Sequence, residues 1–276
     1  MAMSDGDDTF QGLVPEVYEQ FLVPLIFQPY ADDLATRVAA FAPRRVLEIA
    51  AGTGVLTRAM AMRLPTESTI VATDLNPPML QVAQIRGTSR PVSWRQADAM
   101  RLPFADGEFD AVVCQFGAMF FPDKARAFAE ARRVLAPGGA LLFNAWDRIE
   151  DNEFPLVVTQ ALAEVFPDDP PTFMARVPHG YHDVAVIRRD LASGGFGEAP
   201  IIETLARRSR ADTPRVPAIA FCQGTPLRDE IQSRAGASVA AATDAVAEVL
   251  SVRFGQGAID GRIQAHVVAV TTHRDR

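Results

Sequence analysis

The stretch Val46-Leu47-Glu48-Ile49-Ala50-Ala51-Gly52-Thr53-Gly54 predicts a buried strand that runs into a glycine turn and then into a helix over 55–64. Gly52 and Gly54 let the backbone turn tightly and approach a ligand without a Cβ in the way. Twenty residues after Gly54, a second apolar run ends in Asp74. Because an acid at this place holds the hydroxyl groups of a ribose in many α/β proteins, the sequence predicts a site for an adenosine-containing cofactor.

The residues around the turn also bear on which cofactor fits. The dinucleotide fingerprint requires a third small residue at position 57, where this chain has Thr57. Glu48 places a carboxylate just before the turn, and a carboxylate there repels phosphates and favours a cationic ligand. An NAD-dependent oxidoreductase is therefore the less favoured interpretation.

The pattern E-x-A-x-G-x-G over 48–54, followed by Asp74, resembles motif I and the next acidic position of the class I S-adenosylmethionine-dependent methyltransferases. Three further segments resemble motifs of the same family in the same order: 96–104, 106–115 and 133–143. Together they cover residues 46–147. Within the family, the chain looks most similar to the small-molecule methyltransferases of the ubiquinone/menaquinone biosynthesis type.

The resemblance implies S-adenosyl-L-methionine as the cofactor and assigns roles to individual positions. Asp74 would bind the ribose, Asp98 the exocyclic amine of adenine, and the amide of Ala99 a ring nitrogen. Residues 115–118 would face the sulfonium and the transferred methyl group. The complete set of expected cofactor residues is Glu48, Ala50, Gly52, Thr53, Gly54, Asp74, Leu75, Met79, Asp98, Ala99 and Gln115.

The periodicity of the sequence predicts an α/β fold, a doubly wound and mostly parallel sheet with the ligand at the carboxyl ends of the strands. Strands are expected at 45–50, 69–73, 92–95, 109–115, 140–146, 201–208 and 265–272, and helices at 55–64, 77–86, 123–135, 154–166, 183–191 and, as two or three, over 214–254. Residues 173–181 are expected to form a loop. By resemblance the sheet is seven-stranded and Rossmann-like, with the last strand antiparallel, and carries a helical cap.

Three regions are expected along the chain. Residues 1–42 form an N-terminal helical lid, residues 43–147 the S-adenosylmethionine-binding core, and residues 148–276 the rest of the sheet. Two insertions in the last region, 148–182 and 212–262, are expected to form the substrate cap.

The methyl acceptor is expected to be a small molecule, and the abundance of Phe and Met favours an apolar or aromatic one. Its expected contacts are Tyr18, Phe21, Met119 and Phe120. The transfer is expected to be a direct in-line displacement in which positioning and desolvation supply most of the catalysis. Candidates for a general base, needed only if the acceptor loses a proton during attack, are His179, Tyr181 and His182.

Composition excludes several other classes. A net charge of −7 with no basic stripe argues against a nucleic-acid partner, and two cysteines are too few for a disulfide framework or a structural zinc site, so no metal is expected. No apolar run approaches 18 residues, which argues against a membrane span and favours a cytoplasmic protein. A non-catalytic protein that only binds S-adenosylmethionine remains compatible with the same motifs, whereas a pure interaction module does not explain them.

Overall fold

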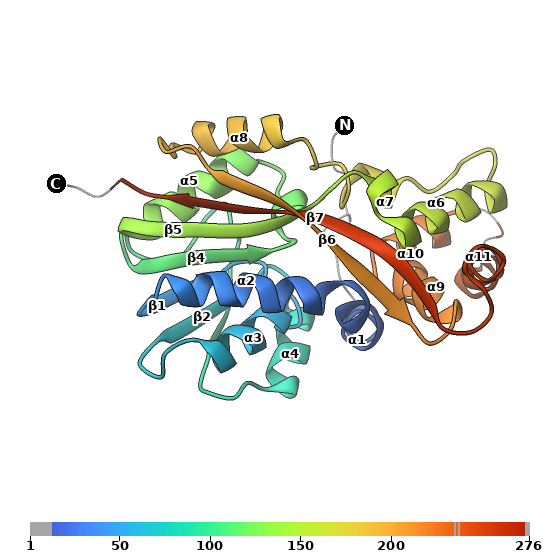
Figure 1. Ribbon diagram of the computed structural model, residues 1–276, viewed down its shortest axis with the longest axis horizontal. Coiled ribbons are helices and arrows are strands. Elements are labelled where there is room, and N and C mark those ends of the chain that lie inside the picture. Colours follow the sequence, from blue (N-terminus) through green and yellow to red (C-terminus); the bar gives the residue numbers. More distant parts are fainter. Residues whose placement is uncertain (1–12, 235, 237, 274–276) are drawn as a thin grey trace.

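The computed structural model describes residues 13–234, 236 and 238–273, so the first part of the expected N-terminal lid and two positions of the second expected cap insertion lie outside the described residues. Within this range seven strands form one sheet in the order β3-β2-β1-β4-β5-β7-β6 (Figure 1). β7 is antiparallel to both of its neighbours, and the other pairs are parallel. The expected mostly parallel, doubly wound sheet is confirmed. The strands are β1 Arg45–Glu48, β2 Thr69–Asp74, β3 Ser93–Gln96, β4 Phe109–Gln115, β5 Leu135–Trp146, β6 Ile201–Ala211 and β7 Ile259–Thr271.

Helices cover both faces of this sheet. In β5, Phe143 packs against Phe128 of α5, whereas Trp146 packs against Tyr30 of α2, because side chains an odd number of residues apart point to opposite faces of a strand. α3 lies beside α2, and α8 beside α5. The helices near the sheet are α1 Val14–Val17, η1 Tyr18–Phe27, α2 Gln28–Ala40, α3 Val55–Arg63, α4 Pro77–Arg86, η2 Ala118–Phe120, α5 Lys124–Val134 and α8 Val184–Ser193.

A second group of helices lies beyond the carboxyl ends of the parallel strands, at the right of Figure 1, where β6 and β7 extend past the rest of the sheet. In this group α11 packs against α6 and α9, and α9 packs against η1. Its members are η3 Ile149–Asp151, α6 Glu153–Val165, α7 Phe173–Arg176, α9 Arg215–Gln223, α10 Leu227–Gln232 and α11 Val239–Phe254. The two segments expected to form a cap therefore lie next to each other at the end of the sheet where a ligand is expected.

The structure differs from the sequence-based expectation in several places. β5 starts at Leu135 instead of 140, and β6 continues to Ala211 instead of ending at 208. Residues 173–176 form the short helix α7 within the expected loop. β7 starts six residues earlier than expected because it alternates between buried and accessible positions over 259–264, a strand signal that the search for an apolar run missed. The prolines within 14–41 predict a series of short helices, but η1 is a π-helix that runs through Pro24 and ends with the amide of Gln28 donating to the carbonyl of Val23, five residues back.

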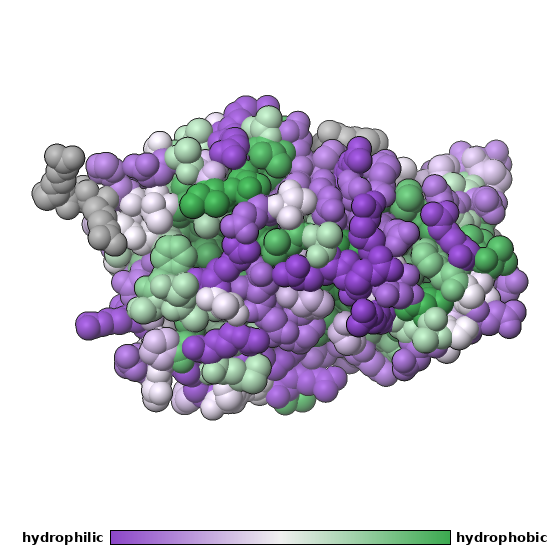
Figure 2. All heavy atoms as spheres, viewed as in Figure 1, coloured by the Kyte–Doolittle hydropathy of each residue, from purple (hydrophilic) through white to green (hydrophobic). Residues whose placement is uncertain are grey.

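Ion pairs attach α2 to β6, the strand at one edge of the sheet. Arg37 and Asp33 of α2 form an ion pair of 2.6 Å with each other. Arg37 also pairs with Glu203 of β6 at 2.9 Å, and Asp33 pairs with Arg207 of β6 at 3.3 Å. Figure 2 shows that hydrophilic side chains cover most of the face on which α2 and β6 lie. Below this layer the fully buried Tyr30 donates a hydrogen bond to the carbonyl of Leu205, 3.0 Å away.

We expect Tyr30→Phe to lower the free energy of unfolding by about 1–2 kcal/mol, because it leaves a buried carbonyl of β6 without its donor and changes little volume. Urea denaturation followed by circular dichroism measures this difference. A variant as stable as the parent protein would show that the hydroxyl does not tie α2 to β6.

Candidate active site

One large cavity lies at the carboxyl ends of the parallel strands, with a volume of about 1190 Å³ including its open mouth. It spans the point where the chain order of the strands reverses, between β1 and β4, which is where open α/β sheets bind their ligands. Its lining combines the carboxylates of Asp74 and Asp98 with aromatic side chains, as small-molecule sites combine a few polar groups with an apolar wall.

The glycine turn after β1 forms part of the wall. Ala50 and Gly52 line the cavity, and both have left-handed backbone angles, with φ of 54° and 56°. A Cβ built on Gly52 would meet only Met79 and Tyr18, at 3.7 and 4.0 Å, so it would project towards cavity residues. Close backbone approach to a ligand is therefore possible at Gly52, as the sequence predicts.

Gly54 has a different role from the one expected. A Cβ on this residue would lie 2.9 Å from the Trp94 ring and 3.2 Å from Ala83, and its φ is 83°. The glycine is needed for the packing of α3 against α4 and β3. Gly54 and the buried Thr53 lie outside the cavity wall, so the structure does not bring these two expected cofactor residues to the cavity, and their role at the cofactor stays a prediction.

Asp74 lies at the tip of β2 and lines the cavity, with 7% of its surface exposed. Its carboxylate accepts hydrogen bonds from the backbone amides of Gly52 and Asn76, both at 2.8 Å. Burial raises the pKa of Asp74, and these amide bonds counteract the shift in part. The side-chain amide of Asn76 is a further donor at 3.5 Å, so neighbouring donors occupy most of the acceptor positions of this carboxylate and fix its orientation in the cavity wall.

Glu48 lies beneath the turn and does not line the cavity. It is 1% exposed, and its carboxyl group accepts a hydrogen bond of 2.5 Å from the hydroxyl of Thr57. Burial raises the pKa of Glu48 to about 8 against the lowering effect of Thr57. The residue that distinguishes this turn from a dinucleotide fingerprint, Thr57, is thus the buried partner of Glu48, a pairing that sequence reasoning missed.

The loop after β3 supplies a further polar part of the wall. Asp98 and Ala99 line the cavity, together with Leu75 and Met79 from the β2–α4 segment. The Asp98 carboxylate accepts a hydrogen bond from the amide of Met100 at 2.8 Å, which fixes the loop.

Gln115 ends β4 and lines the cavity near its middle. Its Nε2 donates to the carbonyl of Phe27 at 2.9 Å, while its Oε1 is buried without a partner among the described residues. The next residue, Phe116, has an unusual φ of 52° and stacks on Trp146 with a ring distance of 3.8 Å. This stack continues the wall from β4 to β5.

The far part of the wall is apolar and aromatic. Of the expected acceptor residues, Tyr18 and Phe120 line the cavity, whereas Phe21 and Met119 do not. Sequence reasoning missed most of this wall because its residues come from segments far apart in the chain. Phe116 also lines the cavity and belongs to 115–118, the segment expected at the transferred methyl group. The missed apolar lining residues are Leu22, Ile26, Trp146, Phe173, Met174, Pro178, Phe221 and Pro226.

The three candidates for a general base lie beside the cavity but outside its described lining. His179 is buried, which lowers its pKa to about 4, and its Nδ1 is 2.8 Å from the carbonyl oxygen of Asp147. Burial raises the pKa of Tyr181, and Nδ1 of His182 is 2.7 Å from the carbonyl oxygen of His179. The structure thus does not bring these three residues to the cavity, and their role as a base stays a prediction.

No helix in the described part of the chain is both long and apolar enough to cross a membrane.

Sequence comparison finds a match between residues 47–143 and the methyltransferase domain family. A demethylmenaquinone methyltransferase of Thermus thermophilus is 40% identical over 128 residues, which cover 46% of this chain and 58% of that protein. A ubiquinone/menaquinone biosynthesis C-methyltransferase of Bordetella avium is 44% identical over 107 residues, 38% of this chain and 42% of that protein. The chain thus spans about half the length of the curated relatives it matches.

Solved structures confirm the fold. Phosphoethanolamine N-methyltransferase 2 of Haemonchus contortus, in complex with S-adenosylhomocysteine, is 18% identical, with a TM-score of 0.58 over 94% of this chain and 57% of that one. The YcgJ protein of Bacillus subtilis is 19% identical, with a TM-score of 0.56 over 90% of this chain and all of that one. These likenesses show that the chain shares the fold of these proteins, and residues 47–143 match the methyltransferase domain family.

The pKa of Glu48 predicts a pH-dependent stability. A carboxyl group with an unfolded-state pKa of 4.5 and a folded-state pKa of about 8 binds more protons when folded, so its stabilising effect is complete below pH 4.5 and is lost as pH rises to 8. Glu48→Gln has no carboxyl group to titrate, so its stability should not fall in this way. We therefore expect the melting temperature of the variant, relative to that of the parent, to rise as the pH is raised from 5 to 8.

Thermal unfolding at several pH values measures this difference. Glu67→Gln, which changes an exposed side chain, serves as the control. A constant offset between Glu48→Gln and the parent over this pH range would show that the buried carboxyl group does not take up a proton.

Proposed function

We propose that the whole chain is a methyltransferase that moves a methyl group from S-adenosylmethionine to a small, apolar acceptor with an aromatic part. The observation that carries this proposal is the division of one cavity into two halves. The wall over β3, β2 and β1 contains Asp98, Asp74 and Gly52, and the wall over β4 and β5 contains Phe116 and Trp146.

The polar half has the donors and acceptors that an adenosine requires. Asp74 would accept hydrogen bonds from the ribose hydroxyl groups, and Asp98 and Ala99 would bind the edge of the adenine. The Gly52 backbone would lie against the methionine portion. The buried Thr57 leaves position 57 without the small residue of a dinucleotide turn, which disfavours an NAD-dependent oxidoreductase.

The apolar half supports an uncharged acceptor. Phe120 and Phe173 lie with their rings 6.4 Å apart on one side, and Phe116, Trp146 and Phe27 pack together on another. Moving an apolar group the size of a Val or Phe side chain from water into an apolar environment is favourable by about 1.5–3 kcal/mol, so an apolar acceptor would be stabilised against this wall. Two relatives are named for demethylmenaquinone and ubiquinone/menaquinone, so a reduced demethylmenaquinone is the first acceptor to test.

The proposed mechanism is a direct displacement. When bound, S-adenosylmethionine supplies a methyl group that the neighbouring sulfonium makes electrophilic. The chain binds both molecules end to end across the strand tips, orients the acceptor at Gln115 and Phe116, and excludes water with the two segments 148–182 and 212–262, which we propose as the substrate cap. Positioning and desolvation then contribute most of the rate enhancement.

Asp74→Ala should weaken the binding of S-adenosylhomocysteine by about 1.5–3 kcal/mol, because a charge-assisted hydrogen bond to the ribose is lost. Isothermal titration calorimetry with S-adenosylmethionine, S-adenosylhomocysteine and NADH measures the affinities. The control is Asp106→Ala, which removes the same type of side chain from an exposed ion pair with Arg133. This variant should leave the affinity for S-adenosylhomocysteine unchanged. Binding of NADH alone by the parent would contradict the proposal.

Phe120→Gln should raise the KM for reduced demethylmenaquinone about tenfold and leave the affinity for S-adenosylhomocysteine unchanged, because only the apolar wall loses contact area. Phe41→Gln, at the exposed end of α2, is the matched control. If the parent binds the cofactor but transfers no methyl group to any of a panel of quinols, phenols and other apolar acceptors, the chain is a non-catalytic S-adenosylmethionine-binding protein.

A further inference from the structure

The segment 177–182, between α7 and α8, contributes to the apolar wall. Pro178 lines the cavity, and the ring of His179 lies 6.1 Å from that of Trp146, another wall residue. The amides of His179 and Gly180 donate to the carbonyls of Met174 and Val177. These bonds shape the local turn, but they do not fix its position relative to the sheet.

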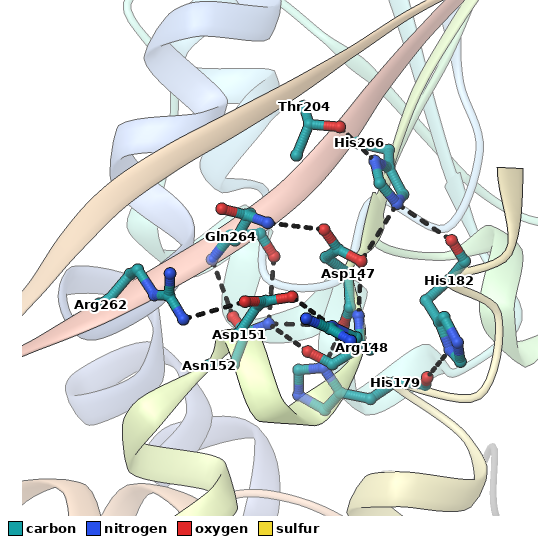
Figure 3. A network of polar contacts seen from close by, with 10 residues as sticks. All are labelled: Asp147, Arg148, Asp151, Asn152, His179, His182, Thr204, Arg262, Gln264 and His266. Carbon is teal, nitrogen blue, oxygen red and sulfur yellow. Dashed lines mark hydrogen bonds and ion pairs between the residues drawn. The ribbon is translucent and has the colours of Figure 1, made fainter.

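Three imidazole rings connect this segment to the sheet (Figure 3). Nδ1 of His179 lies 2.8 Å from the carbonyl oxygen of Asp147. Nδ1 of His182 lies 2.7 Å from the carbonyl oxygen of His179. Nε2 of His266 lies 3.0 Å from the carbonyl oxygen of His182. A carbonyl oxygen only accepts, so each of these nitrogens carries the proton and donates. The series starts on β7 and ends on the residue that follows Trp146.

His266 is the member that belongs to the sheet itself. It lies on β7, is 5% exposed, and its Nδ1 is 2.9 Å from the hydroxyl of Thr204 on β6. Its Nε2 also lies 3.4 Å from the carboxylate of Asp147. Gln264, two residues earlier on β7, donates to the other oxygen of that carboxylate at 2.7 Å. Partners on both sides therefore fix the orientation of the His266 ring.

We propose that His266 is a positioning residue, which holds segment 177–182 against the carboxyl end of β5 and so sets the distance between Pro178 and Trp146 in the acceptor wall. This rests on the proposed function only in assigning that wall to the acceptor. The physical reason is that the hydrogen bond donated from β7 reaches the backbone carbonyl of His182 at one end of the segment, and the hydrogen bond from His179 to the carbonyl of Asp147 joins its other end to the residue after β5.

His266→Phe removes the donor and keeps a ring of similar size, while His266→Gln retains an N–H donor. Arg262→Ala is the matched control, because Arg262 lies on the same strand and in the same network but pairs with Asp151, away from the segment. Hydrogen exchange measured by mass spectrometry reports on the segment directly. We expect amides of 177–183 to exchange about tenfold faster in His266→Phe and at the parent rate in Arg262→Ala, with His266→Gln close to the parent.

A second measurement follows Trp146 in a Trp94→Phe background, where it is the remaining tryptophan. His266→Phe should shift the Trp146 emission, and His266→Gln should restore it. Unchanged exchange of 177–183 in a folded His266→Phe variant would overturn the proposal, and so would faster exchange spread evenly over the sheet, which indicates general destabilisation. Failure of the parent to bind S-adenosylhomocysteine would instead contradict the proposed function, since neither measurement uses a ligand.

Discussion

The hydrogen bond from the amide of Gly52 to the carboxylate of Asp74 is the interaction on which the site depends. It connects the turn after β1 to the tip of β2, so two neighbouring strands end in one rigid unit. The same carboxylate receives the amide of Asn76 and thereby fixes the start of α4. An acid that only bound a ligand would be free to move in its absence, whereas this one is already oriented by the backbone, which lowers the entropic cost of binding.

A second constraint is the order of the strands. Because β1 lies between β2 and β4, the chain crosses from one half of the sheet to the other after β3, and the cavity forms at that crossing. Polar residues follow the strands on one side of the crossing, and aromatic residues follow those on the other. The burial of Glu48 below the turn belongs to the same arrangement, since its carboxyl group and Thr57 join β1 to α3 without entering the cavity.

The parts of the fold that the sequence predicted are those with local signals. The strand–glycine turn–helix at 46–64, the acid at Asp74 and the alternation of strands and helices up to 146 depend on neighbours in the chain, and the structure has them at the expected places. The position of Gly54 against Trp94 was not predictable, because a glycine required by packing and one required by a ligand look alike in a sequence. Part of the aromatic wall was missed for a related reason. Phe173 and Phe221 have ordinary helical surroundings, and only the packing of α9 against η1 and of Phe173 near Phe120 of η2 brings them to the cavity.

The cavity is built from residues inside and outside the segment that matches the methyltransferase domain family. Residues 47–143, which match the methyltransferase domain family, contain Gly52, Asp74 and Asp98 and also Phe116 and Phe120 of the apolar wall, whereas its residues Trp146, Phe173 and Phe221 lie outside the match. Mutations in the later segments can therefore reshape the acceptor wall while the backbone bonds that orient Asp74 stay intact. Under the proposed function, changes in these later segments would alter which acceptor fits the cavity, while the residues that hold the cofactor stay unchanged.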